Sequence, residues 1–230
     1  MATSGTAVFN LDLTELVEEA FERCGAELRS GYDLKTARRS LNLLFADWAN
    51  RGINLWTVEQ GSIPLVQGTA TYNLPSDTVD LMEHVIRTSP GVVSTQSDLS
   101  VSRISVSTYA TIPNKLSQAR PIQIYIDRLT PIPTVTLWPV PNQSNYYTLV
   151  YWRLRRIQDA GDGVNTMDVP FRFIPCMVAG LAYYLAGKLP TGMERLPFLK
   201  SQYDEAWDLA SSEDREKAAV RFVPRQMFIG

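Results

Sequence analysis

The single histidine of the chain, His84, is the first residue to consider for acid–base chemistry. A hydrolytic triad needs a base, an acid that orients the base, and a nucleophile. The acid next to His84 is Glu83, and neighbouring side chains in a strand point to opposite faces. We therefore interpret His84 as an ordinary strand residue.

The sequence contains few of the histidine and cysteine residues that could bind a catalytic metal. Catalytic zinc needs several histidine, cysteine or carboxylate ligands, and the chain has one histidine and two cysteines, Cys24 and Cys176. Two cysteines are too few for a disulfide scaffold, and both lie in apolar segments with helical periodicity. We expect no catalytic residues, no metal and no cofactor.

Four glutamates share one face of a helix that we predict from residue 12: Glu15, Glu18, Glu19 and Glu22. A glycosidase needs two carboxyl groups that flank a cleft, about 5–9.5 Å apart. A glycan hydrolase that uses these carboxylates is therefore one alternative for this chain. Glutamates on an exposed helix face are more often simply solvated, and we favour that interpretation.

Three arginines, Arg153, Arg155 and Arg156, form a basic cluster at the end of a predicted strand. A nucleic-acid-binding module would use such a cluster to contact phosphates. We favour ionic contacts with the acidic helix of a neighbouring subunit, with Glu18 and Glu22 as the partners.

The C-terminal segment, residues 217–230, is unusually apolar for the end of a chain, since free termini are commonly polar and poorly ordered. Arg221 and Arg225 are interspersed among its apolar residues, and Pro224 prevents a continued helix. The segment either folds back on its own domain or forms an arm that docks on another subunit, by strand addition or by filling apolar pockets. We favour the arm.

Helices are predicted at both ends of the chain. A capping box of Asp12 and Glu15 begins the first helix, and Gly25 ends it. Apolar residues at helical spacing predict a second helix over residues 34–50, capped by Asp33. A short link, residues 31–33, joins it to the first helix. Because the link is short, we expect the two helices to be antiparallel neighbours. Two more helices are expected, over residues 170–187 and residues 194–211, with Pro197 in the first turn or at a kink.

The middle of the chain is predicted to be β structure. Short β-branched and aromatic runs indicate strands at residues 56–60, 63–66, 69–74 and 79–86. Three further strands, separated by proline-rich turns, are interpreted as an antiparallel meander: residues 122–127, 134–138 and 146–152. A brief helical turn is expected near residues 105–110.

These elements define the predicted fold class as α+β. The expected domains are a bundle of about four helices from residues 1–54 and 165–216, an inserted antiparallel β domain at residues 55–164 with an exposed, mobile Ser/Thr-rich loop at residues 88–103, and an extended C-terminal arm at residues 217–230.

The amino-acid composition disfavours some classes of function. The formal net charge is −2, with 22 Lys and Arg against 24 Asp and Glu, which disfavours a protein that grips the nucleic-acid backbone. We identify no signal peptide. The longest uncharged stretch, residues 173–187, is shorter than the roughly 20 residues that a membrane-spanning helix needs. We expect a soluble protein, made inside the cell, with no membrane partner.

Several segments of the sequence resemble the head-to-tail adaptor (tail tubular) proteins of short-tailed bacteriophages. The resemblance covers roughly residues 12–216. It consists of similar amino-acid sequences in particular segments rather than of a catalytic motif. The segments that carry it are residues 32–56, 71–75, 112–115, 120–125, 137–141 and 204–210.

The resemblance implies a structural virion protein at the head-tail interface, assembled in the host cytoplasm. Such adaptors form a ring, typically of twelve subunits, beneath the portal protein, present a platform for the tail nozzle protein and extend the DNA channel used in genome ejection. DNA is expected to pass without specific binding. Because the C-terminal segment of the family commonly docks on the portal, the candidate portal contacts are Arg221, Phe222, Arg225, Phe228 and Ile229.

Overall fold

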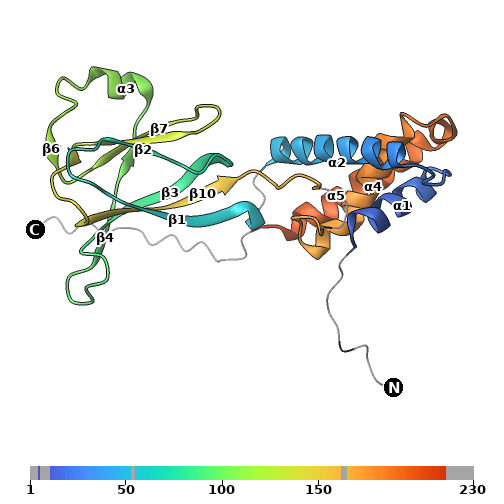
Figure 1. Ribbon diagram of the computed structural model, residues 1–230, viewed down its shortest axis with the longest axis horizontal. Coiled ribbons are helices and arrows are strands. Elements are labelled where there is room, and N and C mark those ends of the chain that lie inside the picture. Colours follow the sequence, from blue (N-terminus) through green and yellow to red (C-terminus); the bar gives the residue numbers. More distant parts are fainter. Residues whose placement is uncertain (1–4, 6–10, 53–54, 162–164, 216–230) are drawn as a thin grey trace, which may run out of the picture. The chain divides into compact units, whose positions relative to one another are not determined.

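The computed structural model describes residue 5 and residues 11–52, 55–161 and 165–215 (Figure 1). The chain divides into two compact units: Met1–Leu44 with Pro170–Gly230, and Phe45–Val169. The first is a helical unit and the second a β unit. The mixed helix-and-sheet architecture confirms the predicted α+β class.

The helical unit is built around helix α4 (Ile174–Ala186), which is buried on nearly every side. It packs against α1 (Leu13–Arg23) and α5 (Leu196–Glu213) (Figure 1). Gly180 of α4 lies directly against Leu44 of α2 (Gly31–Arg51) and Tyr203 of α5, where an added Cβ would be 2.9 Å from both side chains. The absence of a side chain at Gly180 therefore permits the close approach of both neighbours to α4.

The start of α1 confirms the predicted capping box. The Asp12 carboxylate accepts a hydrogen bond from the Glu15 amide at 2.8 Å, and the Glu15 carboxylate accepts one from the Asp12 amide at 3.2 Å. These bonds satisfy amides that have no partner within the helix. Gly25, with φ +74°, follows the end of the helix as predicted, because only glycine adopts this conformation without strain.

The predicted start of α2 is wrong by three residues. The helix begins at Gly31, and Asp33 lies in its first turn instead of at the cap. The Asp33 carboxylate accepts hydrogen bonds from the amides of Arg29 at 3.3 Å and Ser30 at 3.1 Å. The link to α1 is therefore residues 24–30, because residues 31–33 already belong to the helix.

The C-terminal helices follow the prediction closely. Residues 171–173 form a 3-10 turn (η2, Phe171–Phe173) before α4, and a second such turn (η3, Pro190–Arg195) precedes α5. Pro197 lies in the first turn of α5, where its missing amide costs no helical hydrogen bond.

The β unit contains two four-stranded sheets. One has the order β1-β10-β3-β4, from Val58–Pro64, Tyr147–Arg155, Thr78–Thr88 and Ser97–Ser100. The other has the order β2-β8-β7-β5, from Thr71–Asn73, Thr134–Trp138, Gln123–Asp127 and Ser102–Arg103. A small parallel pair, β6 (Gln118–Ala119) with β9 (Val140–Pro141), completes the unit.

Side chains of both sheets form one apolar core. Its fully buried members are Leu65, Leu81, Ile86, Ile124, Val135, Leu137 and Leu149. A six-residue helix, α3 (Val106–Thr111), is capped by Ser105 and confirms the predicted helical turn. The ring of Tyr109 on α3 stacks on Tyr125 of β7 with a centroid distance of 5.4 Å.

The predicted antiparallel meander is only half right. β7 and β8 form the expected hairpin, but β10 leaves that sheet and pairs with β1 and β3 in the other. Pro139 and Pro141 have no amide hydrogen to donate to a ladder, so the chain separates from the sheet after Trp138.

Two other expectations are corrected in the β unit. Residues 88–103 are not a continuous loop, because β4 pairs with β3 although its side chains are mostly exposed. Residues 56–60 and 63–66 are not separate strands: Trp56 lies in a 3-10 turn (η1, Leu55–Thr57), and β1 runs through Gly61 without a break. Gly61 serves to make room for the Tyr151 ring across the ladder.

Candidate interaction sites

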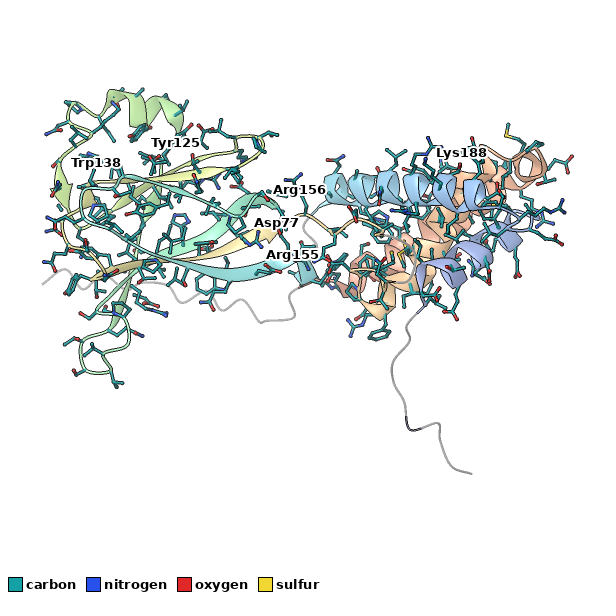
Figure 2. The ribbon with its side chains drawn as sticks, viewed as in Figure 1. Asp77, Tyr125, Trp138, Arg155, Arg156 and Lys188 are labelled. Carbon is teal, nitrogen blue, oxygen red and sulfur yellow. The ribbon has the colours of Figure 1, made fainter. Side chains whose placement is uncertain are left out.

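The arginines at the end of β10 are held by acidic residues of the β unit. Figure 2 shows Asp77, Arg155 and Arg156 gathered there. Arg153 contacts Asp77 at 2.5 Å through Nη1 and Glu59 at 2.8 Å through Nη2. The second oxygen of Glu59 accepts from Nε of Arg155 at 2.6 Å, so one carboxylate bridges two guanidinium groups.

Arg155 has a second acidic partner, Asp168. Its two terminal nitrogens donate to the two oxygens of that carboxylate, Nη2 to Oδ1 at 2.9 Å. The side chains of Arg153 and Arg155 are only 12% and 11% exposed, so their charges are largely removed from water. The network joins β1, β3 and β10 to the segment that follows residue 165.

The pKa values of Asp77 and Arg155 shift as expected for paired charges. The hydrogen bond from Arg153 lowers the pKa of Asp77 below its ordinary value, against the opposing effect of burial. The hydrogen bond and charge of Asp168 raise the pKa of Arg155 above its ordinary value. Asp77 and Arg155 therefore remain ionised near neutral pH.

Arg156 differs from the other two arginines. It is exposed, and its guanidinium donates to the backbone carbonyl of Ser76. No carboxylate pairs with Arg156 among the residues that the structure describes. Of the predicted basic cluster, Arg156 is thus the member whose charge remains available to a partner.

The acidic face of α1 lines a groove with an apolar floor. Glu15 is engaged in the capping box, and Glu19 pairs with Nε of Arg23 at 2.8 Å. Within the described part of the chain, Glu18 and Glu22 are exposed and have no cationic partner. The remaining lining residues are Leu11, Ile174, Pro175 and Val178.

A second groove in the helical unit has the opposite charge. It carries Arg39 and Lys188, with Asp33 as the acidic residue, on an apolar surface that includes Phe21 and Leu185. Lys188, labelled in Figure 2, donates from Nζ to the Oγ of buried Ser40 at 2.7 Å. A third groove, beside α5, is lined by Arg172, Pro175, Ala206, Leu209, Ala210 and Glu213.

The other residues considered for chemistry are placed as follows. His84 lies in β3 opposite Tyr151 and is half-buried. Cys24 and Cys176 are buried, and the Cys24 thiol donates to the carbonyl of Ala182 at 3.1 Å. The described residues contain no cluster of three potential metal ligands, and none of the helices in those ranges is long and apolar enough to cross a membrane.

The proposed portal contacts, Arg221, Phe222, Arg225, Phe228 and Ile229, lie outside the described residues. Sequence reasoning also missed the acidic partners of the arginines, Glu59, Asp77 and Asp168. The available signal was strand alternation, which places residues 153 and 155 on one face of β10. It could not identify the acids opposite them, because that requires the pairing of β10 with β1 and β3.

The fold and these surfaces define a mixed α+β protein with open, charged grooves on its helical unit. Residues 11–225 match the family model of the SU10 adaptor protein, and the chain therefore belongs to that family. It is a structural head-to-tail adaptor of a bacteriophage virion, as the sequence resemblance implies. No curated protein matches the chain.

Proposed function

We propose that the protein forms a ring that joins the portal protein to the tail nozzle protein and extends the DNA channel, most simply with twelve subunits. The family match over residues 11–225 is the observation that supports this role. The near-neutral composition also suits a conduit, since each cationic contact with phosphate adds salt-dependent affinity that would retain DNA.

The experiment is to mix the purified protein with the portal protein of the same phage and measure the mass of the product. A complex that contains one adaptor ring per portal, and that recruits the nozzle protein only when the adaptor is present, is the expected result. An adaptor that stays monomeric with saturating portal would contradict the proposal. Weak retention of duplex DNA at physiological salt is expected in the same preparation.

Within such a ring, Arg156 is the arginine best suited to meet Glu18 and Glu22 of a neighbouring subunit. Arg153 and Arg155 contribute indirectly, because their intrachain pairs fix the backbone from which Arg156 projects. Arg156→Glu should reduce ring formation, and the added changes Glu18→Arg and Glu22→Arg should restore it. Lys200→Glu on the exposed side of α5 is the matched control and should assemble normally. A defect that the charge swap does not rescue would exclude this pairing.

The C-terminal segment is proposed to contact the portal through Arg221, Phe222, Arg225, Phe228 and Ile229. Deletion of residues 217–230 should leave the folded units intact and abolish joining to the portal. Retained joining by the shortened chain would refute this role of the segment.

A further inference from the structure

The groove between α1 and α4 combines two features that a docked peptide would use. Its floor is apolar, with Pro175 exposed and Ile174 half-buried. Its rim carries the carboxylates of Glu18 and Glu22, which lie four residues apart on α1 and have no cationic partner among the described residues. Like charges at this spacing repel one another, so a cationic ligand that lies across them would relieve that repulsion.

The chain itself contains a segment of complementary chemistry. Residues 217–230 include three cations, Lys217, Arg221 and Arg225, and no acidic side chain. The apolar residues of the segment are Val220, Phe222, Val223, Met227, Phe228 and Ile229. An apolar peptide with cations at four-residue intervals matches an apolar floor with a carboxylate rim.

The positively charged groove suits the C-terminal segment less well, and the N-terminal residues suit the acidic groove less well. The groove that carries Arg39 and Lys188 would repel a cationic segment. The N-terminal residues 1–10 have no charged side chain, so they lack the row of cations that would match the two carboxylates. Charge complementarity therefore pairs the acidic groove with the C-terminal segment.

The point at which the described chain ends favours docking on the same molecule. Glu213, the last residue of α5, lines the third groove together with Pro175, and Pro175 also lines the acidic groove. The two grooves are thus contiguous at one turn of α4. Residues 217–230 can extend about 46 Å, whereas Glu15 and Glu22 are separated by about 10 Å along the axis of α1.

We propose that the groove lined by Glu18, Glu22, Ile174 and Pro175 is the docking site of the chain's own residues 217–230 before the protein meets its partners. This contact covers the apolar side chains of the segment in the free protein. Their transfer to a partner then requires exchange from the groove. The inference concerns the isolated chain and stands independently of the proposed ring.

Trypsin cleavage after Arg221 and Arg225 of the full-length protein tests the contact, because a docked segment is a poor substrate. Glu18→Gln with Glu22→Gln should accelerate both cleavages at least tenfold, and 0.5 M salt should accelerate cleavage of the unaltered protein. The matched control, Asp204→Asn with Glu205→Gln, removes two exposed charges from α5 and should leave the rate unchanged. Equal rates in the unaltered protein and the Glu18/Glu22 variant would overturn the proposal.

A cysteine pair distinguishes the same molecule from a second copy as the site of docking. Glu22→Cys with Gln226→Cys should form an intrachain disulfide under mild oxidation and remain monomeric, whereas Glu205→Cys with Gln226→Cys should not link. The native Cys24 and Cys176 are buried and compete little. Interchain dimers in the first variant, or protection from trypsin that rises with protein concentration, would overturn docking on the same molecule.

Discussion

Arg155 and Asp168 form a two-pronged ion pair within the β unit, in which both terminal guanidinium nitrogens donate to the two carboxylate oxygens. The same carboxylate accepts a hydrogen bond from the Gln158 amide at 3.1 Å. The backbone carbonyl of Asp168 accepts one from the Trp56 indole at 3.2 Å. Asp168 is therefore a single anchor for the end of β10, for residue 158 and for the turn that precedes β1.

Asp168→Asn should destabilise the protein by about 3 kcal/mol, because it leaves the largely buried Arg155 with an incomplete set of partners. The matched control is Asp98→Asn, which breaks the more exposed two-pronged pair with Arg87 and should cost at most about 1 kcal/mol. Urea unfolding of the three proteins measures the difference. An equal decrease in the free energy of unfolding of the two variants would show that the Asp168 pair stabilises the protein no more than the exposed pair does.

Gly61→Ala should destabilise the protein by about 1–3 kcal/mol through overpacking. An added Cβ at Gly61 would be 2.5 Å from the ring of Tyr151, which is buried and has little room to move. Gly31→Ala at the start of α2 is the control, since nothing lies within 4 Å of its added Cβ. Its free energy of unfolding should stay the same or rise slightly, and a loss at Gly31 as large as that at Gly61 would argue against overpacking as the cause.

Local signals in the sequence predicted much of the helical unit. The capping box of Asp12 and Glu15 depends on residues three apart, and the position of Pro197 follows from a missing amide. Such signals are contained within one turn of the chain. The error at Asp33 has the same local origin, because an acid is favoured both at the cap and in the first turn of a helix. Here the Asp33 carboxylate accepts from the amides of Arg29 and Ser30, which precede the helix.

The strand partners in the β unit could not be predicted in this way. The pattern of residues 146–152 indicates a strand but does not reveal whether it pairs with β8 or with β1 and β3. The acids Glu59, Asp77 and Asp168 meet the arginines only after that choice is made. The continuity of β1 between residues 56–60 and 63–66 could not be predicted for the same reason, since the role of Gly61 depends on Tyr151 on the neighbouring strand.

Both cysteines should be unreactive in the folded protein. Burial raises the pKa of the Cys24 thiol to about 11, against a small opposing effect of Arg195. At pH 8 only about one Cys24 thiol in a thousand would be ionised, and the thiolate is the reactive form. A thiol reagent such as Ellman's reagent should label neither cysteine until urea unfolds the helical unit. Rapid labelling without urea would show that this unit opens readily.

His84 should make the stability of the protein depend on pH below about 7.5, the pH at which the unfolded histidine begins to bind a proton. Burial lowers the pKa of His84 below its ordinary value, outweighing the attraction of Glu83, and Arg103 acts in the same direction as burial. The Val101 backbone acts weakly in favour of the protonated ring, but neither ring nitrogen makes a hydrogen bond of normal geometry to a described residue. The folded protein therefore resists protonation at a pH where the unfolded chain accepts a proton.

The direction of the pH dependence follows from this difference in bound protons between the folded and unfolded chains. As the pH falls below about 6.5, the unfolded chain gains a proton that the folded chain does not, so the free energy of unfolding decreases, by at most about 1.4 kcal/mol per pH unit. Because His84 is the only histidine, His84→Leu should flatten this part of the stability profile, measured by urea unfolding at a series of pH values. A slope in the variant equal to that of the unaltered protein would assign the pH dependence to other groups.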